Sequence, residues 1–258
     1  MRAVGIILAG GNNNRMKELT HKRAVAAMPI AGSYRSIDFA LSNMTNSHIQ
    51  KVAVLTQYNA RSLNEHLNSS KWWNFGRKQG GLYVFTPTIT NDNGYWYRGT
   101  ADAIYQNMDF LKKSHEPYVV IASGDAVYKM DYSKVLQYHI DKKADVTVVC
   151  KEMDPSDDVS RFGTIRMDDD MRITEFEEKP MVTKSNMIST GIYVIRRRLL
   201  IDLIEHAAEE ERFDFVNDVL IRYKNLKKIY GYKIDHYWSN IATVDAYYKT
   251  NMDFLKPE

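Results

Sequence analysis

The chain is poor in the features that build disulfides, zinc sites and membrane spans. It holds one cysteine, Cys150, so no disulfide can form within the chain, and its seven histidines show no zinc-finger spacing with it. No apolar run reaches the ~18–20 residues that a membrane-spanning helix needs, and the first residues show no signal-peptide cleavage pattern. We therefore expect a cytoplasmic protein that is neither secreted nor inserted in a membrane.

The chain also lacks an excess of charge of one sign. Its 35 Lys and Arg face 32 Asp and Glu, a formal net charge of +3, and the basic residues are dispersed apart from 196–198. This distribution disfavours bulk binding of nucleic acid. With 258 residues, 44% hydrophobic and 26% charged, the composition is that of a globular chain with a sizeable core and excludes disorder.

In the first half of the chain, short apolar runs alternate with amphipathic segments. Runs rich in Val and Ile predict buried strands, and the segments between them predict helices. Strands are expected at 4–9, 51–55, 118–122 and 145–150, and helices at 37–46, 61–67, 100–111 and 132–142. Such alternation is typical of a mainly parallel sheet with helices on both faces.

The second half of the chain changes character. Strands are expected at 163–167, 173–176, 188–195 and near 228–232, and helices at 199–208, 215–223 and 243–255. No internal repeat, low-complexity linker or composition shift marks a domain boundary. We therefore expect one domain over residues 1–258, with a smaller half inserted or appended.

A glycine-rich turn, Gly10–Arg15, follows the first predicted strand. Glycine lets backbone amides approach a phosphate, and Arg15 supplies a planar set of donors for an anionic oxygen. The alternative is an ordinary turn with a surface cluster of asparagines at 12–14. The turn matches neither G-x-G-x-x-G nor G-x-x-x-x-G-K-[ST], so the fingerprints of nicotinamide dehydrogenases and of P-loop proteins are absent.

Asp125 comes directly after the third predicted strand. Ligands of open α/β sheets bind outside the carboxyl ends of the strands, so a carboxylate there faces the crevice. Mg²⁺ prefers one or two carboxylates together with substrate phosphates, which makes Asp125 a candidate ligand. The alternative is a helix cap or a turn residue.

Two more segments carry candidate ligand-binding residues. In 175–180, Lys179 could hold a phosphate and Glu178 a sugar hydroxyl, unless the segment is only a solvated charged turn. In 95–103, Gly99 and Thr100 open a predicted helix whose amides could face a ligand, while the flanking aromatic residues stack on a base or fill the core. The seven histidines are expected to be structural.

Together these segments resemble the sugar-phosphate nucleotidyltransferases, most closely the glucose-1-phosphate adenylyltransferase (ADP-glucose pyrophosphorylase) family of bacterial glycogen biosynthesis. The resemblance runs from Val4 to Leu255. The matching motifs are LAGG at 8–11, LTHKRA at 19–24, YRSIDFALSN at 34–43, TQY at 56–58, WYRGTADA at 96–103, GD at 124–125, FG at 162–163, EKP at 178–180 and STGIY at 189–193.

The resemblance implies a Rossmann-like, three-layer α/β/α (GT-A-like) nucleotidyltransferase domain with a mixed, mostly parallel sheet. The implied reaction is an attack of the phosphate of glucose 1-phosphate on the α-phosphorus of ATP with Mg²⁺, which forms ADP-glucose and releases pyrophosphate. Transfer between two polyanions requires mainly charge neutralisation and in-line positioning.

The resemblance also implies a role for each matching residue. The implied catalytic residues are Arg15, Asp125 and Lys179, and the residues implied to bind nucleotide are Leu8, Gly10, Gly11, Gly99, Thr100 and Ala101. The residues implied to bind sugar phosphate are Gly163, Glu178, Lys179 and Ser189. Asp125 would bind Mg²⁺ with Asn240 as a weakened second ligand, and Lys22 aligns with a position for sugar-phosphate effectors.

At three positions the chain lacks a residue that the family pattern has in its active site. The third glycine of the loop is Asn13, the active-site lysine that contacts phosphate is Val25, and the second metal-binding aspartate is Asn240. Valine cannot neutralise charge, and an amide oxygen brings no negative charge to Mg²⁺. Losing a phosphate-contacting lysine and losing a metal carboxylate typically cost a few kcal/mol each at the transition state, which is orders of magnitude in rate.

The residues that recognise the substrates are kept, whereas residues that take part in the chemistry are lost. This pattern resembles the companion (GlgD-type) subunit of the family, which pairs with a catalytic subunit in a hetero-oligomer and modulates it. The alternative is a fully competent nucleotidyltransferase that makes ADP-glucose or another NDP-sugar. Family members continue beyond the position of Leu255 into a left-handed β-helix whose hexapeptide pattern is absent here. We therefore expect this chain to be the nucleotidyltransferase-like domain of a longer protein.

Overall fold

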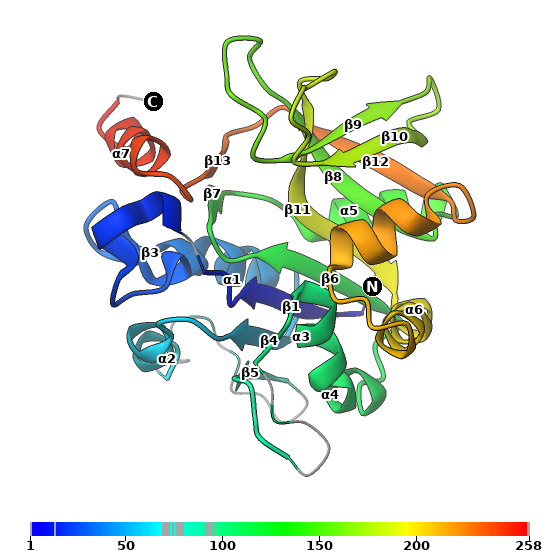
Figure 1. The fold of residues 1–258 in the computed structure, drawn as a ribbon, viewed down its shortest axis with the longest axis horizontal. Coiled ribbons are helices and arrows are strands. Elements are labelled where there is room, and N and C mark those ends of the chain that lie inside the picture. The colour runs from blue at the N-terminus through cyan, green and yellow to red at the C-terminus, as the bar shows by residue number, and fades with distance from the viewer. Residues whose placement is uncertain are drawn as a thin grey trace. The chain divides into compact units, whose positions relative to one another are not determined.

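The chain forms two compact units, each assembled from separate stretches of sequence (Figure 1). Unit 1 comprises 1–3, 97–121 and 132–235, and unit 2 comprises 4–96, 122–131 and 236–258. The computed structural model describes residues 2–12, 14–68, 73, 75, 80–90, 94 and 96–256. Asn13 of the glycine-rich turn and Tyr95 of the aromatic segment lie outside the described residues.

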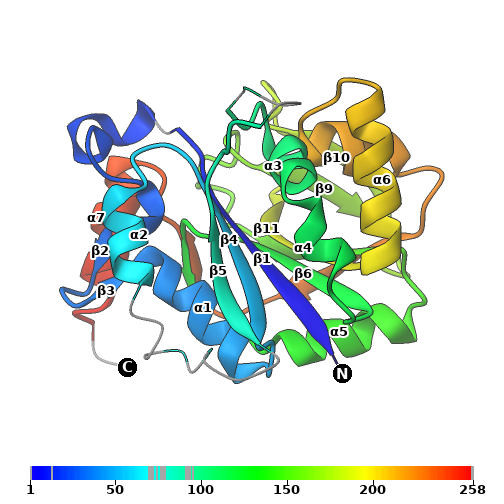
Figure 2. The same cartoon turned by 90° about the horizontal axis from the view of Figure 1, so that it is seen from below.

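Three parallel strands form the centre of unit 2: β1 (Ala3–Ala9), β4 (Lys51–Thr56) and β5 (Gly81–Phe85). β1 pairs with β4 and β4 pairs with β5, side by side in Figure 2. Nearly every residue of β1 and β4 is buried, which explains why both read as continuous apolar runs. β5 is only half-buried and was not predicted.

The rest of unit 2 consists of helices and short strands. Its helices and short strands are η1 (Asn14–Thr20), η2 (Val25–Ala27), β2 (Pro29–Ile30), β3 (Tyr34–Arg35), α1 (Ser36–Asn46), α2 (Arg61–Leu67), β7 (Ala126–Tyr128), β13 (Trp238–Asn240) and α7 (Val244–Asp253). β7 and β13 pair antiparallel, with Ala126 opposite Asn240. At three residues each, they carry too short a pattern to be predicted from sequence.

Unit 1 is built around β11 (Met187–Arg196), which pairs antiparallel with strands on both sides. The other strands are β6 (Tyr118–Ser123), β8 (Val146–Glu152), β9 (Gly163–Met167), β10 (Ile173–Glu178) and β12 (Ile229–Ile234). β8 and β12 pair in parallel, and β9 and β10 pair antiparallel. The helices are α3 (Thr100–Gln106), α4 (Met108–Lys112), α5 (Tyr132–Asp141), α6 (Arg197–Glu209) and the π-helix η4 (Phe215–Ile221).

One predicted helix, 100–111, is broken in the structure. Asn107 separates α3 from α4, and its side-chain amide donates hydrogen bonds to the Ala103 carbonyl at 2.8 Å and to the Tyr97 hydroxyl at 2.9 Å. An asparagine that bonds the backbone in this way competes with the helix for the same carbonyl. The prediction of one continuous helix is therefore wrong at Asn107.

The expected fold class is confirmed: an α/β chain with a mixed sheet and flanking helices. Parallel pairs join β1, β4 and β5, and β8 and β12, whereas β11 pairs antiparallel with β6, β8 and β9, and β9 pairs antiparallel with β10. None of the helices in the described part of the chain combines the length and hydropathy that crossing a lipid bilayer requires.

Candidate functional site

The glycine-rich turn after β1 leaves its backbone open on the surface of unit 2. A Cβ on Gly10 would lie 3.3 Å from Cβ of Gln57, so this glycine allows a close approach of two segments. At Gly11 no described atom would come within 4 Å of an added Cβ, and Arg15 is exposed at the start of η1. This geometry suits backbone contact with an anionic oxygen.

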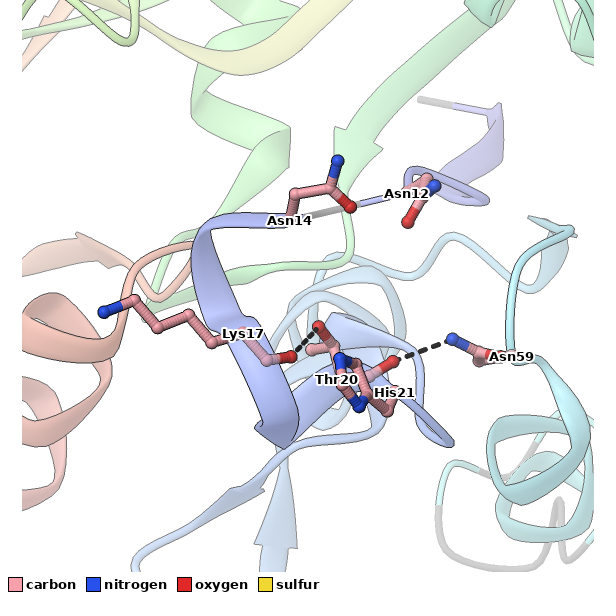
Figure 3. Close-up of a pocket in the computed structure, with 6 residues that line it drawn as sticks. All are labelled: Asn12, Asn14, Lys17, Thr20, His21 and Asn59. Atoms are coloured by element: carbon pink, nitrogen blue, oxygen red, sulfur yellow. Dashed lines mark hydrogen bonds between the residues drawn. The ribbon is translucent and has the colours of Figure 1, made fainter.

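A polar pocket with a volume of about 370 Å³ opens beside this turn (Figure 3). Its lining is made by Asn12, Asn14, Lys17, Thr20, His21 and Asn59. The Asn59 amide donates to the Thr20 carbonyl at 2.7 Å, which ties the pocket floor to the turn after β4. Figure 3 shows the Lys17 side chain pointing away from the other five, so the pocket offers mainly neutral donors and acceptors.

The structure brings together the two residues that the resemblance implied for the metal. The Ile241 amide donates to the Asp125 carbonyl at 2.9 Å, and Asn240 lies opposite Ala126, so the end of β13 sits beside Asp125. The Asp125 carboxylate accepts from the Ser123 hydroxyl, and the Asn240 side-chain oxygen accepts from the Ala242 amide at 3.1 Å.

This pair fits Mg²⁺ only in part. It supplies one carboxylate and one neutral amide oxygen, whereas the ion usually takes one or two carboxylates together with substrate phosphates. Among the residues that the structure describes, no three Asp, Glu, His or Cys side chains gather as a metal site. Asp125 and Asn240 could therefore hold the ion only with charge supplied by bound phosphate.

Val25, at the position of the family lysine, belongs to an apolar core of unit 2. It is 8% exposed and clusters with the buried side chains of Met16, Met28, Ile30, Val127 and Ile241. The position therefore contributes packing in this chain, and no cation stands in its place.

The residues implied for sugar-phosphate binding meet in unit 1, at the β9–β10 hairpin. Gly163 pairs with Glu178, and the Lys179 ammonium lies 3.3 Å from the Glu178 carboxylate. Lys179 has a φ of +46°, and its amide donates to the Phe162 carbonyl at 3.2 Å, which turns the chain sharply after the strand. Burial raises the pKa of Glu178, and the charge of Lys179 opposes that rise.

Ser189 joins this group through Tyr193, to which the sequence assigned no role. The Ser189 hydroxyl lies 3.2 Å from the Tyr193 hydroxyl across an irregularity in β11, where Gly191 has a φ of +76°. Burial raises the pKa of Tyr193, and the charges of Glu178 and Asp214 raise it further. Tyr193 was visible as the last residue of the matching motif, but no sequence signal marked Asp214.

We call Gly163, Glu178, Lys179, Ser189 and Tyr193 the sugar-phosphate cluster. It combines one ammonium group, one carboxylate and two hydroxyls, all from unit 1. An ammonium suits a phosphate, and carboxylates and hydroxyls suit the hydroxyls of a sugar.

The start of α3 differs from the expectation that its amides face a ligand. The Ala101 and Asp102 amides both donate to the Phe213 carbonyl, at 2.8 and 3.3 Å. The Thr100 hydroxyl accepts from the Phe215 amide at 2.9 Å. These two amides are therefore taken by the chain itself, and nucleotide binding by Gly99, Thr100 and Ala101 stays a prediction.

Gly163 offers a test of the cluster's geometry. A Cβ added there would lie 2.7 Å from the buried Phe176 ring and 2.9 Å from the Glu178 carboxylate. We expect Gly163→Ala to lower the free energy of unfolding by about 1–2 kcal/mol and to weaken glucose 1-phosphate binding several-fold, because both neighbours must shift. Urea unfolding and calorimetric titration measure the two effects. Gly94→Ala, at a position with open space, is the control; equal stability and affinity of both variants would contradict this geometry.

Comparison with known proteins gives a consistent result. The pattern of the nucleotidyl transferase family ("Nucleotidyl transferase") matches residues 4–257. Glucose-1-phosphate adenylyltransferase of Clostridium novyi is 42% identical over 98% of this chain and 66% of its own length; that of Thermosipho melanesiensis is 40% identical over 98% and 62%; and that of Bacillus anthracis is 42% identical over 100% and 69%. The chain spans about two thirds of the length of these relatives. With a match over nearly its whole length, this chain belongs to the nucleotidyl transferase family.

Proposed function

We propose that this chain is a subunit of a glucose-1-phosphate adenylyltransferase in glycogen biosynthesis, and that it is regulatory or only weakly active by itself. The observation that carries this proposal is a contrast between two sets of residues. The sugar-phosphate cluster is assembled with the Lys179 ammonium beside the Glu178 carboxylate. Val25, by contrast, is built into an apolar core, and Asn240 offers a neutral oxygen beside Asp125.

The proposed binding step uses the sugar-phosphate cluster. The Lys179 ammonium would pair with the phosphate of glucose 1-phosphate, while Glu178 would accept hydrogen bonds from sugar hydroxyls and Ser189 would contact the same sugar. Gly163 leaves the room that this arrangement needs, because any side chain there would meet Glu178.

The proposed chemical step should be slow, because the position of the family lysine carries no positive charge in this chain. In the family reaction a phosphate oxygen bonds to the α-phosphorus of ATP while the bond from that phosphorus to the leaving pyrophosphate breaks, so negative charge gathers on the attacking phosphate, the α-phosphoryl group and the pyrophosphate. Arg15 would bring positive charge to the phosphates of ATP and Lys179 to the sugar phosphate, but Val25 brings none. Mg²⁺, when bound, would neutralise phosphate charge, and Asp125 and Asn240 are the residues that would hold it. The remaining groups can bind both substrates better than they can accelerate their reaction.

The proposal also names partners and a place. ATP would bind at the turn of Leu8, Gly10 and Gly11, sugar-phosphate effectors near the exposed Lys22, and a catalytic subunit of the same family would complete a hetero-oligomer. The single cysteine is compatible with the cytoplasm as the place of action. The balanced charge disfavours nucleic acid as a partner.

The experiment compares binding with turnover. Calorimetry should detect glucose 1-phosphate binding to the purified chain, while ADP-glucose formation with ATP and Mg²⁺ should stay far below the ~1 s⁻¹ of an ordinary enzyme. Addition of the catalytic subunit should produce turnover whose effector response depends on this chain.

Variants refine this comparison. Asn240→Asp together with Val25→Lys should raise turnover, whereas Asn68→Asp, at the exposed end of α2, should not. Turnover of ~1 s⁻¹ or more by the wild-type chain alone would favour the competent enzyme instead. Absence of both glucose 1-phosphate binding and any effect on the catalytic subunit would overturn the proposal altogether.

A further inference from the structure

Ser36, the first residue of α1, bonds to two separate segments of unit 2. It is fully buried; its amide donates to the Met28 carbonyl at 3.1 Å, and its hydroxyl donates to the Gly124 carbonyl at 3.0 Å. Met28 directly follows η2, which begins at Val25, and the Gly124 carbonyl belongs to the peptide bond that leads into Asp125. One buried residue therefore fastens the segment of the missing lysine and the segment of the candidate metal carboxylate.

The peptide group before Asp125 is also held from the side of β1. The Gly124 amide donates to the Leu8 carbonyl at 3.0 Å. A Cβ added to Gly124 would lie 3.2 Å from Cβ of Ala26 and 3.3 Å from Cβ of Ala9, so the backbone here is closely packed. Hydrogen bonds on both sides of Gly124 and this packing leave the chain little room to move as it enters Asp125.

Asn43 holds the far end of the same segment. It lies seven residues, or about two helical turns, beyond Ser36 and therefore on the same face of α1. Its side chain is buried; the amide group donates to the Tyr128 carbonyl at 3.2 Å, and the side-chain oxygen accepts from the Met130 amide at 3.0 Å. A buried side-chain amide with both donor and acceptor bonded to backbone fixes the chain that it contacts. Segment 124–130 is thus anchored by α1 at both ends.

This anchored segment carries the candidate metal pair. Asp125 lies within it, and β7 places Ala126 opposite Asn240 of β13. The Ile241 amide donates to the Asp125 carbonyl at 2.9 Å, so the end of β13 is tied to the same segment. The Ser123 hydroxyl donates to the Asp125 carboxylate and orients it. The location of both candidate ligands therefore depends on what holds the segment in place.

We propose that Ser36, with Asn43 at the far end of the segment, is a positioning residue for the Asp125–Asn240 pair, and that the contribution of Mg²⁺ to ATP binding depends on it. The inference rests on the proposed function, because it concerns the same weakened pair of ligands. A pair with one negative charge attracts the ion weakly, so it helps binding only if its oxygens are in place beforehand. The 34–43 motif thereby gains a role that needs no contact with a substrate.

The test is the effect of Mg²⁺ on ATP binding to the purified chain. Calorimetry measures the dissociation constant of ATP with Mg²⁺ and again with a chelator, and the improvement caused by Mg²⁺ is compared between variants. Asp125→Asn should lower this improvement about tenfold, because it removes the charge of the pair, and Ser36→Ala about threefold, because one buried hydrogen bond is lost. A general loss of stability would not change the improvement, since both measurements use the same folded variant.

Ser114→Ala is the matched control. Ser114 is also a buried serine, and its hydroxyl donates to the Phe110 carbonyl at 2.6 Å in unit 1. This variant should lose stability as Ser36→Ala does, in urea unfolding, but keep the wild-type improvement by Mg²⁺. The double variant of Ser36→Ala with Asp125→Asn should show no smaller an improvement than Asp125→Asn alone, because both changes act through the same carboxylate.

The outcomes separate the positioning role from the proposed function. A wild-type improvement by Mg²⁺ in Ser36→Ala, or an equal loss in Ser114→Ala, would overturn the positioning role. ATP binding that is absent from the wild-type chain, or that does not respond to Mg²⁺, would overturn it too, because the pair would then hold no ion. Rapid turnover by the wild-type chain alone would instead contradict the regulatory function, and the comparison between variants would still decide the role of Ser36.

Discussion

Lys179→Ala is expected to weaken the binding of glucose 1-phosphate roughly 10- to 100-fold. The loss follows from removing a charge-assisted contact to phosphate, which typically contributes about 1.5–3 kcal/mol. The Lys179 side chain is 60% exposed and 3.3 Å from Glu178, so it can reach a ligand without leaving the cluster. Its ion pair with Glu178 by itself contributes little to stability, because exposed pairs are screened by water. Affinity should therefore fall while the unfolding midpoint hardly changes.

Lys184→Ala provides a closely matched control for this loss. Lys184 is 59% exposed and lies 3.0 Å from the carboxylate of Glu177, so it has the same charge, a similar exposure and the same kind of partner, and like Lys179 it lies between β10 and β11. Calorimetric titration at a fixed ionic strength should show wild-type affinity for Lys184→Ala. Equal losses in the two variants would mean that the hairpin attracts phosphate only by its general charge, and would remove Lys179 from the candidate site.

His139 is expected to make the chain sensitive to acid. Its side chain is 1% exposed, its Nδ1 lies 2.8 Å from the Thr147 hydroxyl, and its Nε2 is buried with no described hydrogen-bond partner. Burial, helped by the charge of Arg196 and opposed by that of Asp145, lowers the pKa of His139 from 6.5 to about 4. The folded chain therefore keeps this ring neutral over a range in which the unfolded chain protonates it.

The direction of the pH effect follows from these two pKa values. As pH falls below 6.5 the unfolded state takes up a proton first, so the free energy of unfolding falls until the folded state also protonates near pH 4. His139 should thus remove about 2 kcal/mol of stability between pH 7 and pH 5. Urea unfolding at the two pH values measures this difference.

Two variants isolate the contribution of His139. His139→Gln keeps a polar partner for Thr147 but does not titrate, so its stability should change about 2 kcal/mol less between pH 7 and pH 5 than that of the wild type. His115→Gln, at an exposed position, should behave as the wild type does. A wild-type pH dependence in His139→Gln would show that other groups cause the acid sensitivity.

Much of the fold was predictable because its buried strands appear in the sequence as short apolar runs. β1, β4, β6 and β8 are short runs rich in Val, Ile and Ala. Such runs are typical of strands that are covered on both faces of a sheet. The prediction failed where a local pattern was weak or overruled. β7 and β13 exist only because each pairs with the other, and Asn107 breaks a helix by bonding to Ala103 and Tyr97.

The candidate site divides in the same way. Gly163, Glu178, Lys179 and Ser189 were found because their motifs are contiguous in sequence, and the structure joins them through Tyr193. Asp214 was not predicted. In the structure its carboxylate accepts from the Asn217 amide at 2.7 Å at the start of η4, and its charge raises the pKa of Glu178.

The sequence by itself determined the family, the apolar strands, and the loss of charge at Val25 and Asn240, since each depends on which residue stands at a position. The tertiary structure alone decided what surrounds those positions. It buried Val25 in an apolar core and set Asn240 beside Asp125. It also turned the amides at the start of α3 toward Phe213, in a segment whose Phe215 lies 115 residues beyond Thr100. A buried amide takes whichever acceptor the folded chain brings to it, and a pattern of neighbours in sequence carries no record of that choice.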